Sequence, residues 1–337
     1  MREFIINSND AGQRLDKFIS KAVRGIPVSL MYKAIRTKKI KVNRKRAEQK
    51  QILQKGDVVQ MFLAEDLFSD RITDNELFTI TPSLNIIYED DNIILCDKAP
   101  GVLVHSGDGD GKASGDGDAR DRNTLIYHIQ AYLAQKGEYD PSRESSFAPA
   151  LCNRIDRNTG GIVIGAKNAT ALRCINERIR SNQITKKYLC AVHGRVPNQM
   201  ATLKDYLIKD SKTNTVKVYS APIRGAKEIV TKYRCLEYNK PKDLSLLEIE
   251  LVTGRTHQIR AHMSSIGNSL LGDGKYGRIE LDKRYGYKHQ ALYSYKISFL
   301  VCDDELAYLN GREFCVNQDS VYFLREFEKR GSGAFFG

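Results

Sequence analysis

The sequence predicts an α+β protein with a mixed, largely antiparallel sheet and a small basic N-terminal module. At 337 residues the chain exceeds one ordinary compact domain, so we expect a large domain and a small one. Strand patterns alternate irregularly with short helices and form no repeated β-α unit, which disfavours a doubly wound fold. Positive charge is concentrated near the N-terminus, where residues 14–64 contain fourteen Lys and Arg but only three acids. This segment therefore carries eleven of the twelve net positive charges.

The N-terminal module is predicted to contain two helices followed by short strands. Apolar residues recur at helical spacing over residues 14–23 and 30–39, and Ser29 stands where the N-cap of the second helix belongs. Residues 39–43 alternate like a strand, and residues 56–62 form another strand that follows a Gly-Asp turn. This pattern leaves the cations on the helix faces and in the adjoining loop.

The concentrated charge predicts a polyanionic partner. A membrane surface would attract the same charge, but no aromatic-flanked amphipathic anchor accompanies it. Nucleic acid is therefore favoured, with a merely solvated basic hairpin as the weaker alternative. The side chains expected to dock this nucleic acid are Lys33, Arg36, Lys38, Lys39, Lys41, Arg44, Lys45 and Arg46.

Composition excludes several classes of protein. No apolar run reaches the roughly 18 residues of a membrane-spanning helix, and the first residues lack the apolar stretch of a signal peptide. The seven cysteines are odd in number and contain no C-x-x-C pair, which argues against a disulfide framework and a zinc site. We expect a soluble, cytoplasmic chain, monomeric by default, with reduced and mostly buried thiols.

The elements of the larger domain follow in order along the chain. Residues 84–98 contain two β-rich apolar runs around a polar turn, which predicts a hairpin. Residues 161–168 predict a buried strand that ends at Asn168, the cap of the next helix, and residues 186–196 alternate as a further strand. A strand, a turn and a short helix then lead to a C-terminal stop at Gly267.

The predicted boundaries are 1–70 for the module, 71–85 for a polar linker, 86–327 for the larger domain and 328–337 for a tail. Residues 107–122, rich in Gly and Asp, are predicted to be a flexible insertion. Their spacing does not fit a calcium loop, which needs oxygen ligands at positions 1, 3 and 5 and a glutamate at position 12. It does not fit a phosphate loop either, because the lysine of "GDGDGKAS" is followed by alanine rather than Ser or Thr.

The segment "LCNRIDRNTGG" places Asp156 between Arg154 and Arg157, ahead of a glycine pair. No second acid or histidine stands beside this aspartate. Taken alone, such a pattern is most often a solvated turn with incidental ion pairing. Only motifs elsewhere in the chain favour a catalytic role for it.

Several motifs in order resemble those of the RluA-type pseudouridine synthases, which isomerise uridine to pseudouridine in RNA. They are "DKAPGVLVHSG", "NRIDRNTGG", "KKYLC", "TGRTHQIRAH" with "GNSLLGDGKYG", and "QALYSYKISF". The module resembles the S-four RNA-binding domain in "RLDKFI", "SLMYKAIRTKKIKVNRKR" and "LQKGDVV". The resemblance covers most of the chain, and the combination is specific although any one motif would be weak.

The resemblance implies three catalytic residues: Asp156 acts at the ribose, Arg260 is its ion-pair partner, and Tyr188 stacks on the extracted uracil. A stacked base cannot turn to present another atom to its sugar, so extraction is required. Attack on the anomeric carbon and removal of the neighbouring sugar proton both stay open as routes. The reaction is redox-neutral and releases nothing, so it requires no cofactor and no metal. The residues implied in substrate binding are Arg154, Arg157, Thr159, Arg255, His257 and Leu292.

The sequence departs from the family pattern at three positions. The family usually has histidine at Asn153, serine at Gly160 and histidine at Tyr293. None of these is an implied catalytic residue, so the departures concern substrate fit more than catalysis.

The expected substrate is large-subunit ribosomal RNA, because the S-four-like module accompanies the ribosomal members of the family, and transfer RNA is the alternative. A non-catalytic RNA-binding assembly factor would explain the basic segment but not the retained Asp156, Tyr188 and Arg260. A glycoside or nucleoside hydrolase would need a partner acid, and none stands at readable spacing.

Overall fold

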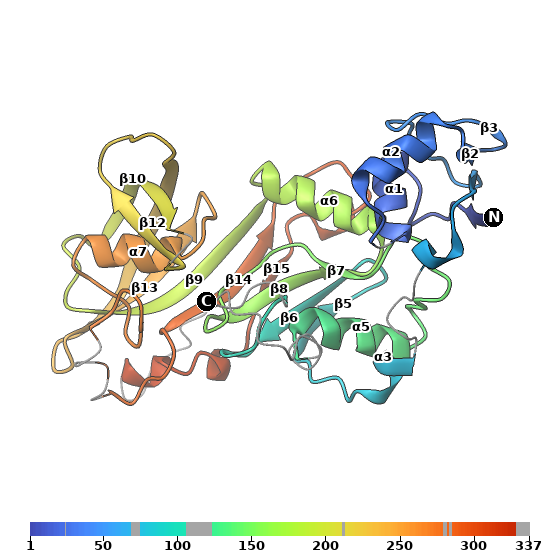
Figure 1. Cartoon of the computed structure of the whole chain (residues 1–337). Coiled ribbons are helices and arrows are strands. Elements are labelled where there is room, and N and C mark those ends of the chain that lie inside the picture. Colours follow the sequence, from blue (N-terminus) through green and yellow to red (C-terminus); the bar gives the residue numbers. More distant parts are fainter. Residues whose placement is uncertain are drawn as a thin grey trace.

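The computed structural model describes residues 1–23, 25–68, 75–105, 123–210, 213–278, 282 and 285–327. These residues form a four-stranded sheet near the N-terminus and an 11-stranded sheet beyond it (Figure 1). The predicted insertion at 107–122 and the tail at 328–337 lie outside the described residues. Among the described helices, none is long and apolar enough to cross a membrane.

The N-terminal module, residues 1–68 here, combines two helices with strands in the order β1-β4-β2-β3. Helix α1 buries Leu15, Phe18 and Ile19, as its spacing predicts. The predicted cap at Ser29 is wrong: α2 begins at Val28 with Pro27 as its N-cap, because the fixed φ of proline, −60° here, suits the start of a helix. The bounds are β1 Arg2–Ile5, α1 Leu15–Ala22, α2 Val28–Arg36, β2 Ile40–Val42, β3 Lys45–Arg46, β4 Val58–Met61 and a 3₁₀ turn Glu65–Phe68.

The large sheet runs in the order β11-β10-β12-β13-β9-β14-β8-β6-β5, with β15 paired to β14 and β7 to β8. Among the described strands only β14 and β8 pair in parallel, which confirms a mixed, largely antiparallel sheet. The bounds are β5 Ile86–Glu89, β6 Ile93–Lys98, β7 Ala150–Leu151, β8 Gly160–Ala166, β9 Ile184–His193, β10 Met200–Asp210, β11 Thr215–Tyr219, β12 Lys227–Asn239, β13 Leu244–Leu251, β14 Leu292–Phe299 and β15 Glu313–Cys315.

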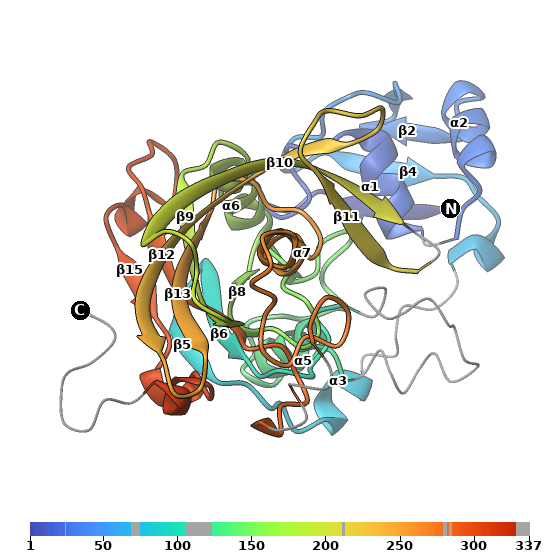
Figure 2. The ribbon, with the colours of Figure 1, turned by 90° about the vertical axis from the view of Figure 1, so that its left-hand side faces the viewer.

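Helices cover both faces of this sheet. Helix α6 packs on one face with the apolar cluster that contains Leu189 and Ala191, while α5 and α7 pack on the other with Tyr188, Cys190 and Val192. The predicted alternation of β9 is thus confirmed. Figure 2 shows α7 against the concave side of the curved sheet. The bounds are α3 Asn75–Thr79, α5 Leu125–Gln135, α6 Ala169–Arg180 and α7 Gln258–Ser265.

Several local predictions are confirmed, and one helix was not predicted. Asn168 caps α6, since its Oδ1 accepts from the Ala171 amide at 2.8 Å, and Gly267 ends α7 with a φ of 85°. All seven cysteines are free and four of them are buried. Helix α3 lies within the predicted linker and packs against α5, a helix that the periodicity argument did not include.

Candidate active site

Asp156 lies in the loop between β7 and β8, at a turn closed by the Thr159 amide, which donates to the Asp156 carbonyl at 3.0 Å. Just beyond the turn, Gly161 has a φ of 114°, and a Cβ there would lie 2.2 Å from the Ser294 carbonyl oxygen. Only glycine fits so close to another backbone. This glycine lets β8 start beside β14 and fixes where the turn leaves the sheet.

A buried lysine ties the same turn to β6. The Nζ of Lys98 donates to the carbonyls of Ala99, Val102 and Arg157, each at 2.9 Å. Burial lowers the pKa of Lys98 to about 7, although the nearby Asp156 and Asp97 carboxylates oppose that shift. Three carbonyl acceptors satisfy all three donors of the ammonium, so Lys98 holds the Asp156 turn in place.

The carboxylate of Asp156 is paired with an arginine from α7. Its Oδ2 accepts from Nη1 of Arg260 at 2.9 Å, and 26% of the Asp156 side chain remains exposed. The other side of the guanidinium forms two parallel hydrogen bonds, both 2.8 Å, with the carboxylate of Asp273. The predicted pair of Asp156 and Arg260 is therefore present as a contact.

Asp273 fixes the arginine. It is fully buried, and its Oδ1 also accepts from the amides of Lys275 at 2.9 Å and Tyr276 at 3.1 Å. Burial alone would raise the pKa of Asp273, but the Arg260 hydrogen bonds outweigh it and the pKa lies below its usual value. Arg260 is itself buried and its pKa is raised, because the two carboxylates outweigh desolvation. Both groups stay charged.

His257 stands at the N-cap of α7 in the left-handed region, with a φ of 52°. Its Nδ1 lies 2.9 Å from the Tyr276 hydroxyl and its Nε2 lies 3.9 Å from Oδ2 of Asp156. Burial lowers the pKa of His257, so the ring is neutral near pH 7 and contributes hydrogen bonds rather than charge.

A cavity of about 270 Å³ opens beside this carboxylate. Tyr188 lies on its wall with 6% of its surface exposed, and burial raises the pKa of its phenol to about 12. The phenol is therefore neutral. Of the residues predicted for the catalytic and substrate-binding site, eight line this cavity: Arg154, Asp156, Thr159, Tyr188, Arg255, His257, Arg260 and Leu292.

The predicted substrate-binding residues differ in their surroundings. Arg154 and Arg255 are exposed at the cavity, whereas Thr159 is buried and accepts from Gln290 at 3.1 Å. Arg157 is not among the residues that line the cavity: its Nε donates to the Gly101 carbonyl at 3.0 Å. Arg157 thus braces the turn from outside.

The three departures from the family pattern have local explanations. Oδ1 of Asn153 accepts from the Ile164 amide at 2.7 Å, so this side chain supports β8. A Cβ on Gly160 would lie 2.3 Å from the ring of Tyr293, and the hydroxyl of Tyr293 donates to Asp97 at 2.7 Å. The tyrosine ring therefore occupies the space that a residue other than glycine at position 160 would need.

Sequence reasoning left three contributors unassigned. Asp273 stands in the motif "GDGKYG" and Lys98 in the motif "DKAPG", but neither was given a role. Lys186, which lines the cavity and whose pKa is lowered by burial, directly precedes the "KY" of "KKYLC". A charged residue inside a motif is the sequence signal that they share, but the burial that gives each its role is visible only in the structure.

The predicted RNA-docking cations lie elsewhere, on the module. All are exposed at the end of α2 or around the β2–β3 turn, except Lys41, which is partly buried, with its Nζ 5.6 Å from the ring centre of Phe62. They are absent from the wall of the Asp156 cavity.

The chain matches two family models. The model described as RNA pseudouridylate synthase covers residues 92–265, and the model of the S4 domain covers residues 13–59. A relative from Mycoplasma genitalium, named an uncharacterized RNA pseudouridine synthase, is 33% identical over 88% of each chain. Ribosomal large subunit pseudouridine synthase C of Buchnera aphidicola is 30% identical over 85% of this chain and 83% of its own.

A solved structure has the same fold. Human RNA pseudouridylate synthase domain containing 1 matches with a TM-score of 0.55 and 18% identity, over 73% of this chain and 87% of its own. The synthase model covers just over half of the sequence and includes the Asp156 turn, Tyr188 and Arg260. From the motifs, the fold and these matches together, we conclude that the chain belongs to the RNA pseudouridylate synthase family, isomerases that convert uridine in RNA to pseudouridine.

Proposed function

We propose that this protein isomerises a uridine in large-subunit ribosomal RNA, with Asp156 acting at the ribose of a nucleotide turned out of its helix. The observation that carries the proposal is the partly exposed Asp156 carboxylate, held 2.9 Å from Arg260 on the wall of the same cavity as Tyr188. At about 270 Å³ the cavity is near the lower end of small-molecule sites, about 300 Å³. That size suits one nucleotide rather than a duplex.

The reaction needs a carboxylate at the sugar. The bond from ribose C1′ to N1 of uracil breaks, the base rotates, and C1′ bonds to C5 of the same base, while C5 loses a proton and N1 gains one. Asp156 can attack C1′, as the nucleophile of a retaining glycosidase does, or remove the 2′ proton. In both routes Arg260 keeps the carboxylate oriented, and Asp273 keeps Arg260 oriented.

Tyr188 acts in this proposal as a neutral ring. Stacking of a base on an aromatic face is worth about 1–3 kcal/mol and offsets part of the unstacking cost. A phenol with a pKa of about 12 is protonated at neutral pH, so Tyr188 can accept the C5 proton only as its own hydroxyl proton passes to a hydrogen-bonded partner. Leu292, with 4% of its surface exposed, supports the base from the apolar side of the cavity.

Ribosomal RNA is favoured over transfer RNA by the basic module and by relatives whose names specify the ribosomal large subunit. A nucleoside hydrolase would have no use for the exposed cations of the module.

The test is release of label from C5 of uridine, measured on large-subunit ribosomal RNA and on transfer RNA with wild type, Asp156→Asn and Asp303→Asn. We expect release from ribosomal RNA by wild type, and a loss on the order of 10⁴–10⁶-fold in Asp156→Asn, the range that removal of one member of a catalytic triad costs. Asp303 is an exposed aspartate in the loop after β14, so its substitution should change nothing.

The other outcomes each contradict part of the proposal. Release of label from transfer RNA alone would mean that transfer RNA, and not ribosomal RNA, is the substrate. RNA binding without release by wild type would favour the assembly factor, and free uracil as the product would favour a hydrolase. Full activity of Asp156→Asn would show that the Asp156 carboxylate takes no part in the reaction.

A further inference from the structure

The module is joined to the rest of the chain by a cluster of polar contacts. Asp10, in the loop after β1, is fully buried, and its Oδ1 accepts from the amide of Ser146 at 3.0 Å and from its hydroxyl at 2.5 Å. The hydroxyl of Ser146 also accepts from Nε2 of Gln13 at 2.7 Å. Ser146 belongs to the loop between α5 and β7, so the two parts of the chain meet here.

Two further anchors complete what we call the docking contact. The carboxylate of Glu144 accepts from Asn7 at 3.2 Å and from Asn9 at 2.7 Å. At the start of α6, the Ala169 amide donates to Oδ1 of Asn9 at 3.1 Å, and Arg173 donates to a backbone carbonyl of the module at 3.1 Å. The docking contact comprises Asn7, Asn9, Asp10, Ala11 and Gln13 on the module, and Glu144, Ser146, Ala169 and Arg173 on the larger part.

No apolar core is shared across the docking contact in the described residues. The buried cluster of the module contains only residues of the module, and the clusters around the large sheet contain none of them. A cavity of about 280 Å³, lined by Lys21, Tyr139 and Glu144, lies beside the contact. Hydrogen bonds are directional, whereas apolar packing is not, so this contact specifies one orientation of the module.

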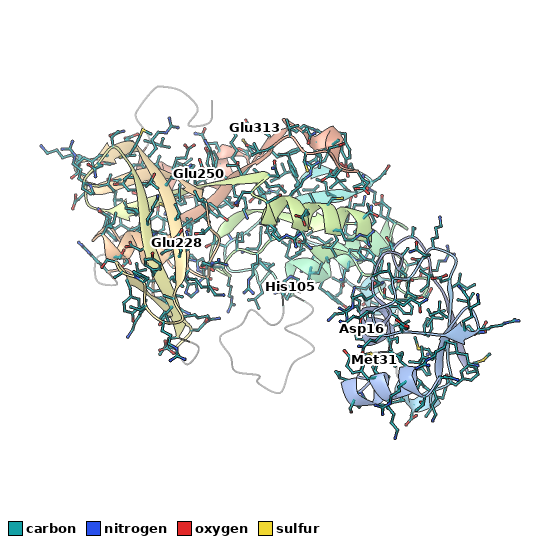
Figure 3. All side chains as sticks on the ribbon, turned by 90° about the horizontal axis from the view of Figure 1, so that it is seen from above. Asp16, Met31, His105, Glu228, Glu250 and Glu313 are labelled. Carbon is teal, nitrogen blue, oxygen red and sulfur yellow. The ribbon has the colours of Figure 1, made fainter. Side chains whose placement is uncertain are left out.

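That orientation places the basic face, the eight cations Lys33, Arg36, Lys38, Lys39, Lys41, Arg44, Lys45 and Arg46, far from the Asp156 cavity. In Figure 1 the module, with α1 and α2, lies at the opposite end from strands β12 and β13. Figure 3 shows the same separation, with Asp16 and Met31 in the module and Glu228 and Glu250 on β12 and β13. Leu251, next to Glu250, lines the cavity. Along α6, Ala169 at the docking contact and Ile179 at the cavity are about 15 Å apart, and the module extends beyond.

One short RNA loop cannot fill both places. A strand advances about 3.4 Å per stacked nucleotide, so the α6 span alone exceeds four nucleotides, before the thickness of the module is added. Phosphates next to a uridine in the cavity therefore lie outside the range of the basic face. A folded RNA can reach both places when a second helical segment lies at that separation from the uridine.

We propose that the docking contact is a specificity determinant: it sets the distance between the basic face and the cavity, so that the enzyme modifies a uridine most efficiently in a folded RNA that also offers a second helix to the module. This inference rests on the proposed isomerisation. It assigns to Glu144 and Ser146 a positioning role in substrate selection, although neither contacts the cavity.

The experiment compares two substrates with the full-length enzyme. One is a large-subunit ribosomal RNA transcript, and the other is a stem-loop excised around the uridine that wild type modifies in that transcript. The variant Glu144→Ala/Ser146→Ala removes the two side-chain anchors that the loop before β7 contributes, and leaves the contacts of α6 in place. The control Ser142→Ala/Arg143→Ala changes the same loop at two side chains that bind Asp140 within it. Release of the C5 label gives kcat/KM, and small-angle X-ray scattering reports whether the module leaves its place.

We expect the docking variant to lose at least about tenfold in kcat/KM on the transcript, to keep the stem-loop rate within about twofold, and to be more extended in solution. The loop control should behave as wild type. Unchanged stem-loop activity also shows that the variant is folded. Equal loss on both substrates, or no loss on the transcript, would overturn the inference, whereas absence of release by wild type from every RNA would instead overturn the proposed function.

Discussion

At the scale of residues, one guanidinium joins two acids with different tasks. Asp273 accepts two hydrogen bonds, from Nε and Nη2 of Arg260, and is completely buried. Asp156 accepts one hydrogen bond, from Nη1, and stays partly exposed. The rigid fork of arginine makes this division possible, and a lysine ammonium could not reproduce it. The family motif was enough to predict Asp156, Tyr188 and Arg260. The role of Asp273 was not predictable, because it depends on a turn that brings residue 273 back to α7.

Tyr188 provides a prediction about pH. Burial raises its pKa from an ordinary value of 10.0 to about 12, so the folded state favours the neutral phenol. The stability from this preference is fully present below pH 10 and is lost as the pH rises from 10 toward 12. The phenolate absorbance of wild type minus that of Tyr188→Phe should stay near zero until about pH 11. A tyrosine that ionises near pH 10 in this difference would mean that the ring is solvated.

Gly160 and Tyr293 should be coupled. Serine at 160 would place its Cβ 2.3 Å from the Tyr293 ring, so Gly160→Ser alone should lower the free energy of unfolding by about 1–3 kcal/mol. Gly160→Ser combined with Tyr293→His, the pair usual in the family, should recover part of this loss through a favourable coupling of about 0.5–3 kcal/mol. Urea unfolding of the two single variants and the double variant measures it. Strict additivity would show that the ring does not exclude the side chain.

At the scale of elements, prediction succeeded where local chemistry decides the structure. The hairpin of β5 and β6, strand β8 and the Asn168 cap of α6 follow from turn residues and periodicity over a few neighbours. Helix α5 was missed because it follows the Gly/Asp-rich segment and buries residues on more than one side, which blurs a single apolar stripe. Helix α3 has five residues and packs against α5, a contact between distant segments that no short window reveals.

A buried ion pair helps to hold helix α6 to the C-terminal part of the fold. The fully buried Arg178 donates from Nε at 2.7 Å and from Nη2 at 2.5 Å to Asp304, and this arginine lowers the pKa of the carboxyl. Asp304→Ala would leave the guanidinium buried without its acid, so we expect a loss of about 3–5 kcal/mol in unfolding free energy. Asp303→Ala, at the exposed neighbouring position, is the control for chemical denaturation. Similar small losses in both variants would argue against the pair.

At the scale of the whole molecule, charge and chemistry are separated. Eleven of the twelve net positive charges belong to residues 14–64, while the carboxylate pair and its cavity lie in the larger part. Composition was enough to predict that separation, and the motifs predicted the cavity residues. The attachment of one part to the other was not predictable, because Asn7, Asp10, Glu144 and Ser146 are ordinary polar residues in loops. The predicted boundaries at 70, 85 and 327 stay predictions.

The basic face should control the dependence of RNA binding on salt. Replacement of Lys38, Lys39 and Lys41 by Gln should reduce the slope of log affinity against log salt by roughly one unit for each phosphate that is no longer neutralised. Lys204, Lys217 and Lys227, exposed lysines outside the module, supply a control triple with the same change of charge. Binding of ribosomal RNA at a series of salt concentrations measures both. An equal reduction in the two triples would mean that total charge, rather than the basic face, sets the slope.

The polar character of the docking contact has a consequence for a cell under heat stress. Contacts without a common apolar interior open at a lower free-energy cost than the interiors themselves. Mild warming or denaturant should therefore free the module while the isomerising centre is still intact. The enzyme would then lose its preference for the folded RNA while its centre still worked, and missing pseudouridines in that RNA would be the first sign of damage.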